Sequence, residues 1–246
     1  MDLAAWLSPL GTAVRLFFVC FTLKSLQALR WRDVAAYSHW MGLRSFHFVS
    51  LASVVVAMAL TIQTTLELKR YQAEDLTGAA IAIGLLRELG PLTISIAWCV
   101  RVSALIAEEA RNYKHLWQNE EQFAAQFILP RYVAALLMSI PLAGYGLVVG
   151  FITAGVVAPL LGVSSLNYFV DSARDAIRDR DIIVYFIKLS AINPLVGAFA
   201  GAVCGWKSKD VSEPVAANAV TATYIGCLIL NLAITVASYL EGDFTL

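Results

Sequence analysis

The chain has 246 residues, of which 59% are hydrophobic and only 15% charged, and its formal net charge at pH 7 is zero. Soluble domains are typically about 45–50% apolar and about 25% charged, so this composition excludes an ordinary soluble domain and indicates an integral membrane protein. A net charge of zero provides no basic field for nucleic acid. The four cysteines lie apart in apolar segments and the three histidines form no ligand cluster, so we expect neither a disulfide nor a metal site.

Residues 1–45 differ in pattern from the rest of the chain. Arg15 and Lys24 bracket a run of eight apolar or small residues, LFFVCFTL, which is too short to span a bilayer. Further arginines alternate with tryptophans through the segment. This mixture is typical of a helix that lies in the headgroup region, and a buried helix of the kind found in soluble proteins is the alternative.

Five apolar segments follow, and each has at least the roughly 20 residues that a crossing requires. The sequence therefore predicts an all-α integral membrane protein with an amino-terminal interfacial helix and five transmembrane helices. Gly90-Pro91 predicts a kink in the second segment, because proline removes a backbone donor and crowds the preceding turn. The segments are Phe46–Leu66, Leu76–Ala107, Tyr132–Leu161, Ile182–Trp206 and Val215–Leu240.

The orientation follows from the distribution of lysine and arginine. With the amino terminus in the cytoplasm, the inside segments hold ten of these residues and the outside loops hold five. Cytoplasmic loops of membrane proteins carry an excess of Lys and Arg. We therefore expect a cytoplasmic amino terminus, and five crossings place the carboxyl terminus on the opposite side.

Arg87 and Glu88 are adjacent charges inside the second apolar segment. Arg87 lies roughly 16 Å along a helix from Leu76, close to the middle of a ~30 Å hydrocarbon layer. A charge at that depth costs at least about 2.5–3.5 kcal/mol, so such residues normally face a bundle, a cavity or a transport path. The alternative is a mutually neutralising pair that only holds helices together.

Small residues predict where helices pack closely. Gly197, Gly201 and Gly205 are spaced four residues apart and therefore share one helix face, which allows a neighbouring backbone to approach. We expect this face to pack tightly against another helix.

The segment between Glu108 and Arg131 is the best candidate for contact with a cytoplasmic partner. The chain contains no nucleotide-binding loop, so the energy for any transport must come from a partner or an ion gradient. Phe123 and Phe127 are spaced i, i+4 and, with Trp117, form an apolar face that could dock into a groove. The alternative is an amphipathic connector that lies on the membrane.

Several motifs together resemble the MlaE/YrbE family of ABC transporter permeases. The most specific is LLRELGP (Leu85–Pro91), followed at the family's spacing by Arg101 and Glu109. The resemblance extends over roughly residues 46–240. It also includes LTIQ (Leu60–Gln63), RYQAEDLTG (Arg70–Gly78), ILPR (Ile128–Arg131), Asp181 with Lys188 at the start of the fourth segment, and VAANAVTAT (215–223).

The resemblance implies the permease subunit of a lipid transporter, with an interfacial segment at 1–45 and an MlaE-type transmembrane domain at 46–246. Members of the family form homodimers with two copies of a cytoplasmic ABC ATPase, usually with a partner that bears an MCE domain. They move phospholipids between the inner membrane and the outer envelope. ATP is bound by the ATPase, so the permease itself is expected to need no cofactor and to be no enzyme. The implied location is a bacterial inner membrane, with the chloroplast inner envelope as the alternative.

The resemblance places lipid near Arg87 and Glu88, and the family motifs together with the residue pattern of the 108–131 segment give the expected roles of further positions. Lipid would contact Gln63, Tyr71, Arg87, Glu88 and Arg101. Coupling to the ATPase would involve Trp117, Glu121, Gln122, Phe123 and Phe127.

Two other classes of function remain open from the residues alone. One is a secondary transporter in which Glu88 carries a coupling proton, whose activity would respond to an uncoupler. The other is a membrane scaffold for an envelope complex, in which substitution of Arg87 would affect assembly only.

Overall fold

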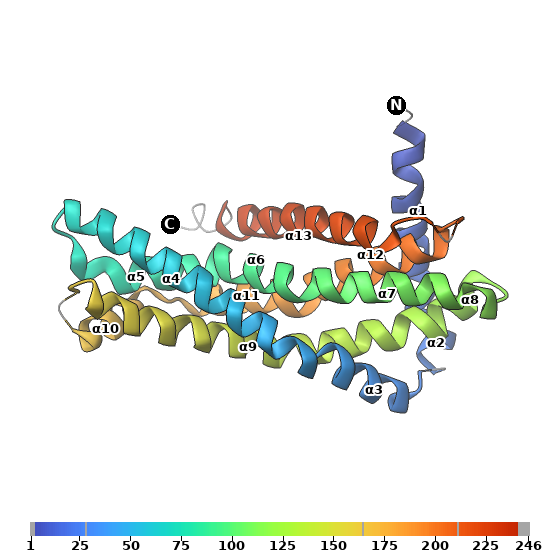
Figure 1. Ribbon diagram of the computed structural model, residues 1–246, viewed down its shortest axis with the longest axis horizontal. Coiled ribbons are helices and arrows are strands. Elements are labelled where there is room, and N and C mark those ends of the chain that lie inside the picture. The colour runs from blue at the N-terminus through green and yellow to red at the C-terminus, as the bar shows by residue number, and fades with distance from the viewer. Residues whose placement is uncertain (1–2, 28, 164, 211, 241–246) are drawn as a thin grey trace. The chain divides into compact units, whose positions relative to one another are not determined.

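The computed structural model describes residues 3–27, 29–163, 165–210 and 212–240, and within these ranges the regular structure is helical throughout (Figure 1). Helices of ordinary α type make up most of the chain. They are α1 (Leu3–Cys20), α2 (Leu23–Gln27), α3 (Trp31–Met41), α4 (Phe46–Arg70), α5 (Thr77–Gly84), α6 (Gly90–Ile94), α7 (Val100–Tyr113), α8 (Glu120–Gln122), α9 (Leu129–Leu160), α10 (Leu166–Ala176), α11 (Asp179–Phe186), α12 (Asn193–Lys207) and α13 (Val215–Leu240).

Shorter helical turns of other types join or interrupt these helices. Four of them are π-helical and lie inside longer helical segments, where they add a residue to the turn. The 3₁₀ turns are η1 (Leu43–Ser45), η2 (Glu74–Leu76) and η5 (Lys114–Leu116), and the π turns are η3 (Leu85–Leu89), η4 (Ser95–Cys99), η6 (Phe123–Ile128) and η7 (Ile187–Ile192).

Five continuous helical segments within the described residues are long and apolar enough to cross a membrane. Each overlaps one of the five apolar segments in the sequence, so the predicted class of an all-α membrane protein is confirmed. The first four begin before the predicted bounds, and the first of them begins at Trp31, inside the predicted interfacial segment 1–45. An apolar helix precedes the first of them, within α1. The segments are Trp31–Arg70, Glu74–Leu116, Glu120–Leu160, Asp179–Lys207 and Val215–Ser238.

The chain divides into two compact units, each assembled from three stretches of sequence. The predicted interfacial segment belongs to unit 1, together with parts of the later spans. Unit 1 comprises Met1–Ser45, Trp98–Ser139 and Ala191–Cys227, and unit 2 comprises Phe46–Ala97, Ile140–Ser190 and Leu228–Leu246.

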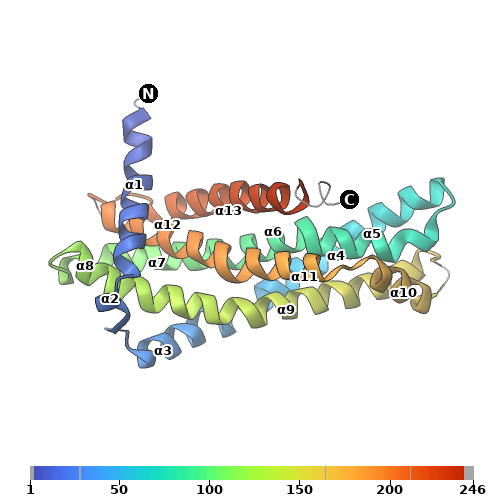
Figure 2. The ribbon, with the colours of Figure 1, turned by 180° about the vertical axis from the view of Figure 1, so that it is seen from behind.

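In unit 1, α12 packs against α7 through its glycines, and the two helices lie side by side in both views (Figure 1, Figure 2). A Cβ added at Gly197 would lie 3.1 Å from the carbonyl oxygen of Cys99, and one at Gly201 would lie 2.5 Å from that of Ser103. Gly205 faces the carbonyl oxygen of Ala107 in the same way. The glycines therefore let the two backbones approach more closely than any side chain would permit.

In unit 2, the amphipathic helix α10 covers the beginning of the second span. Gly78 of α5 faces the carbonyl oxygen of Phe169, and the amide of Ala79 donates to the hydroxyl of Ser172. Phe169 is buried against the apolar side chains of α4, α5 and α9. The first turns of the second span thus pack against another helix of the chain.

The predicted irregularity at Gly90-Pro91 takes the form of the π turn η3. Pro91 has no N–H, and its ring conflicts with the carbonyl four residues earlier, which belongs to Arg87. The π turn directly before the proline widens the helix there, and α6 continues beyond it. The π turn η7 likewise directly precedes a proline-containing pair, Asn193-Pro194, in the fourth span.

Candidate functional site

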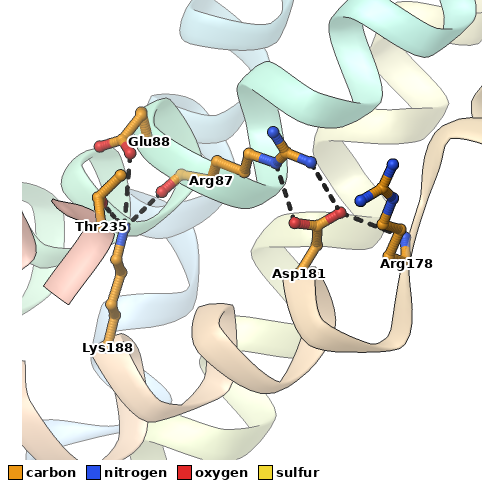
Figure 3. A network of polar contacts seen from close by, with 6 residues as sticks. All are labelled: Arg87, Glu88, Arg178, Asp181, Lys188 and Thr235. Carbon is orange, nitrogen blue, oxygen red and sulfur yellow. Dashed lines mark hydrogen bonds and ion pairs between the residues drawn. The ribbon is translucent and has the colours of Figure 1, made fainter. Parts of the chain in front are cut away.

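Arg87 and Asp181 form a bidentate ion pair in unit 2 (Figure 3). Arg87 Nε donates to Oδ1 of Asp181 at 2.9 Å and Nη2 donates to Oδ2 at 3.3 Å. The Asp181 carboxylate also accepts from the backbone N–H of Arg178, so it caps the amino terminus of α11. Only 2% of the Asp181 side chain is exposed, against 28% for Arg87. The carboxylate is therefore a fixed buried group that orients the guanidinium.

Lys188 occupies the centre of a second group of contacts on the other side of the same turn (Figure 3). Its ammonium donates to the backbone oxygen of Arg87 at 2.6 Å and to Oγ1 of Thr235 at 2.5 Å. Glu88 Oε1 lies 3.8 Å away. Because Pro91 supplies no N–H to the Arg87 carbonyl, Lys188 takes the place of the missing helical donor. The lysine is fully buried, which such pairing makes tolerable.

One interpretation of the sequence was that Arg87 and Glu88, the adjacent charges in the second span, neutralise each other. In the structure each of them pairs with a different residue. Arg87 and Glu88 leave the helix in different directions, toward Asp181 and Lys188 respectively (Figure 3). Neighbouring helical residues are about 100° apart around the axis, so adjacent side chains do not face each other. The result is a network of two acidic and two basic groups, in which 40% of the Glu88 side chain is exposed. We call Arg87, Glu88, Asp181 and Lys188 the charge cluster.

The charge cluster lies closer to the ends of two spans than the sequence estimate placed Arg87. Asp181 belongs to the first turn of α11, which opens the fourth span, and Thr235 is five residues from the end of α13. The depth of Arg87 was counted along the helix from Leu76. The helix turns that directly follow Leu76 are packed against α10. Arg87 is therefore nearer the edge of the spans than a count along the apolar segment suggests.

The other residues expected to contact lipid belong to three different parts of the chain. Gln63 is exposed on α4, and Tyr71, in the turn after α4, is 78% exposed. Arg101 belongs to unit 1, where Nη1 donates to the hydroxyl of Ser45 at 2.6 Å. Arg101 thus ties the start of α7 to the end of the amino-terminal segment.

The expectation that Phe123 and Phe127 project toward a partner does not fit their positions. Both rings are buried, with 0% and 1% exposed. Phe123 stacks on Phe127 with centroids 4.9 Å apart and on Trp206 of α12 at 4.2 Å. An apolar face with i, i+4 spacing can pack against a partner protein or against other helices of the same chain. Here Phe123 and Phe127 are buried by other residues of unit 1.

The remaining residues of the predicted coupling segment are more accessible. Glu121 is exposed, and Gln122 closes the first turn of α8 by accepting from the backbone of Gln118. Trp117 is half-buried in the loop before α8. Asn119 caps α8 through its side chain, which accepts from the N–H of Gln122 at 2.9 Å.

The family motifs point to Asp181 and Lys188 in the sequence, whereas nothing in the sequence points to Thr235, which contacts the charge cluster. Lys188 carries a direct signal, a lone cation inside an apolar segment, and such residues normally face a partner. Asp181 precedes that segment in a run of mixed charges that resembles an exposed loop. Thr235 has no signal, because threonine is common in spans and its neighbour Lys188 comes from another helix.

The sequence model of the family described as Permease MlaE matches residues 34–110 and 122–237, which is most of the chain. The chain belongs to the MlaE permease family. The matched stretches contain every residue of the charge cluster. They begin after α1 and α2 and leave out the loop that contains Trp117.

Curated relatives agree with this assignment. The chain is 25% identical over 219 residues to protein trigalactosyldiacylglycerol 1, chloroplastic, of Arabidopsis thaliana, covering 84% of this chain and 61% of that protein. It is 25% identical over 209 residues to a probable ABC transporter permease protein of Rickettsia typhi, covering 80% and 79%. A probable ABC transporter permease protein of Synechocystis is 24% identical over 199 residues, covering 77% and 76%.

Proposed function

We propose that the chain is the membrane-spanning subunit of an ABC transporter that moves phospholipid between the inner membrane and the outer envelope. Membership of the MlaE permease family and the names of the relatives support this function. The single observation that carries it is the charge cluster, in which two basic and two acidic side chains meet within apolar helices. Groups that are expensive to bury are retained in membrane spans mainly where they serve transport.

The cluster suits a phospholipid headgroup. Arg87 is oriented by Asp181 and is partly exposed, so a phosphate can approach its guanidinium. Glu88 is the most exposed acidic group of the cluster and can receive an amine. Lys188 is fully buried and holds the π turn in place, so its role is to position Arg87 and Glu88.

The partners that we propose follow the family. Two copies of the permease would enclose the lipid between them, and a cytoplasmic ATPase would supply the energy. An MCE-domain protein would receive or deliver lipid on the outer side. With the amino terminus in the cytoplasm of a bacterium, the start of the fourth span and the end of the fifth both lie toward the outer face of the inner membrane, so the charge cluster would face the outer leaflet.

The function is tested by reconstituting the permease with its ATPase in vesicles and measuring transfer of labelled phospholipid to acceptor vesicles. We expect transfer that stops when the ATPase is inactivated and continues in the presence of a protonophore. Transfer that persists without ATP hydrolysis and collapses with the protonophore would indicate a proton-coupled carrier instead. An assembled complex that moves no lipid under any condition would indicate a scaffold.

A further inference from the structure

A polar pocket of about 470 Å³ lies within unit 1, between α3 and the segment that joins the second and third spans. Its volume is in the range of small-molecule sites. The lining contains both charge signs together with aromatic rings. It comprises Arg30, Asp33, Tyr37, Glu109, Tyr113, Leu116, Trp117, Gln126, Phe127, Pro130 and Arg131, and none of these belongs to the charge cluster.

The positions of the lining residues along the chain place the pocket beside the ends of two apolar segments. Glu109 is two residues beyond Ala107, where the second apolar segment ends, and Arg131 directly precedes the third. Tyr113 is six residues beyond Ala107, about 9 Å along a helix. Headgroup layers extend roughly 5–8 Å beyond each side of the hydrocarbon core. By this count Glu109 and Arg131 lie within the headgroup layer and Tyr113 lies at its aqueous edge, so phospholipid headgroups can reach this pocket.

The charges of the lining balance each other. Arg131 pairs with Glu109 at 3.0 Å, and its guanidinium also donates to the hydroxyl of Tyr37. Arg30 and Asp33 form a second pair, which is loose at 3.7 Å and exposed, with 74% and 37% of the side chains accessible. An exposed pair of this kind contributes little to stability, so a ligand with one positive and one negative group can replace it. A ligand with only a negative group would pair with Arg30 and leave Asp33 without a positive partner.

The aromatic residues add a second source of recognition. Tyr113 is 49% exposed, and the rings of Tyr37 and Trp117 also line the pocket. Aromatic faces attract ammonium groups, with about 0.5–1 kcal/mol per contact at exposed sites. The indole Nε1 of Trp117 is buried without a hydrogen-bond partner. A buried donor in this state is costly, and an oxygen of a bound ligand would satisfy it.

We infer that this pocket binds the headgroup of a zwitterionic phospholipid, with the phosphate at Arg30 and the ammonium between Asp33 and the ring of Tyr113. The site is additional to the charge cluster and does not depend on the proposed transport function. Arg131 of α9 pairs with Glu109 of α7 and donates to the hydroxyl of Tyr37 in α3, so these three side chains form the rigid wall against which the headgroup rests.

Native mass spectrometry of the full-length permease in detergent tests the inference, because it counts bound lipid molecules. The probes are dihexanoyl phosphatidylethanolamine, dihexanoyl phosphatidylglycerol and inorganic phosphate. The pocket variant is Arg30→Gln with Tyr113→Leu. Its matched control is Arg70→Gln with Tyr168→Leu, which removes an arginine from another exposed i, i+3 pair and another exposed tyrosine.

We expect the pocket variant to bind one phosphatidylethanolamine fewer per chain than wild type, or to need about tenfold more lipid for the same occupancy. The control variant should bind as wild type does. Phosphatidylglycerol and phosphate should not fill the site. Equal binding by the pocket variant and wild type would overturn the inference, as would a site filled equally by phosphatidylglycerol or by phosphate alone. Unchanged lipid counts with weaker co-purification of the ATPase would reassign the pocket to a protein partner.

Asp33→Asn provides a second variant in case the first alters folding. This change keeps the size of the side chain and removes only the charge expected to meet the ammonium. Thermal unfolding should match that of wild type while phosphatidylethanolamine binding falls. A loss of binding that accompanies a lower unfolding midpoint in both variants would contradict a local headgroup site.

Discussion

Lys188 shows how one side chain can repair a backbone defect that another residue creates. Proline at position 91 leaves the carbonyl of Arg87 without its helical donor, and the Lys188 ammonium supplies one from the facing span at 2.6 Å. The sequence contains both halves of this arrangement, since Pro91 and Lys188 are conspicuous in apolar segments. It does not indicate that they serve each other, because the pairing of helices is not encoded in either segment alone.

Replacing Lys188 with methionine should destabilise the permease, although it removes a buried charge. The substitution removes two hydrogen bonds that the ammonium donates, to the Arg87 carbonyl and to the Thr235 hydroxyl, and a hydrogen bond to a charged group contributes about 1.5–3 kcal/mol. We expect a lower midpoint of thermal unfolding in detergent. Lys209→Met, at an exposed position, is the control and should unfold as wild type does. A midpoint equal to or above that of wild type would show that the ammonium does not support the turn.

The predicted spans agree with the observed helices because long apolar segments leave the backbone no alternative to helix within a bilayer. The details within the spans follow from tertiary packing and could not be predicted. The glycines of α12 indicated a close approach, but only the structure identifies α7 as the partner. Phe123 and Phe127 form an apolar face that suits a partner or the bundle, and the structure places them in the bundle.

Gly201→Leu should destabilise unit 1 by about 1–3 kcal/mol, the usual cost of overpacking. A Cβ at this position would lie 2.5 Å from the carbonyl oxygen of Ser103 and 3.1 Å from Cβ of Ile106, so the two helices would have to separate. Thermal unfolding in detergent measures the effect. Gly144→Leu in α9 is the control, because a Cβ there meets nothing within 4 Å. If both variants unfold at the same temperature, the glycine face of α12 does not determine packing.

Considered over the whole chain, the sequence predicts the class of protein and the number of spans, and its motifs resemble the family to which the chain belongs. The charge cluster was anticipated in part, through Arg87 and Glu88. Its completion required contacts between helices that are about 94 to 101 residues apart along the chain. Gln63, Tyr71 and Arg101 have motif spacing in common with the family, and their contact with lipid stays a prediction.

Lipid transfer by a variant that lacks both charges of the Arg87–Asp181 pair tests the proposed mechanism most directly. Arg87→Gln with Asp181→Asn removes the two charges together, so no buried charge is left without its partner, which would itself cost about 3–5 kcal/mol. Arg70→Gln with Glu67→Gln removes an exposed pair from the same unit as the control. Transfer of labelled phospholipid between reconstituted vesicles is the measurement, with co-purification of the ATPase as the check on assembly. We predict that the Arg87–Asp181 variant assembles but transfers lipid at the background rate while the control variant transfers at the wild-type rate. Wild-type transfer by the Arg87–Asp181 variant would contradict a role of the charge cluster in transport.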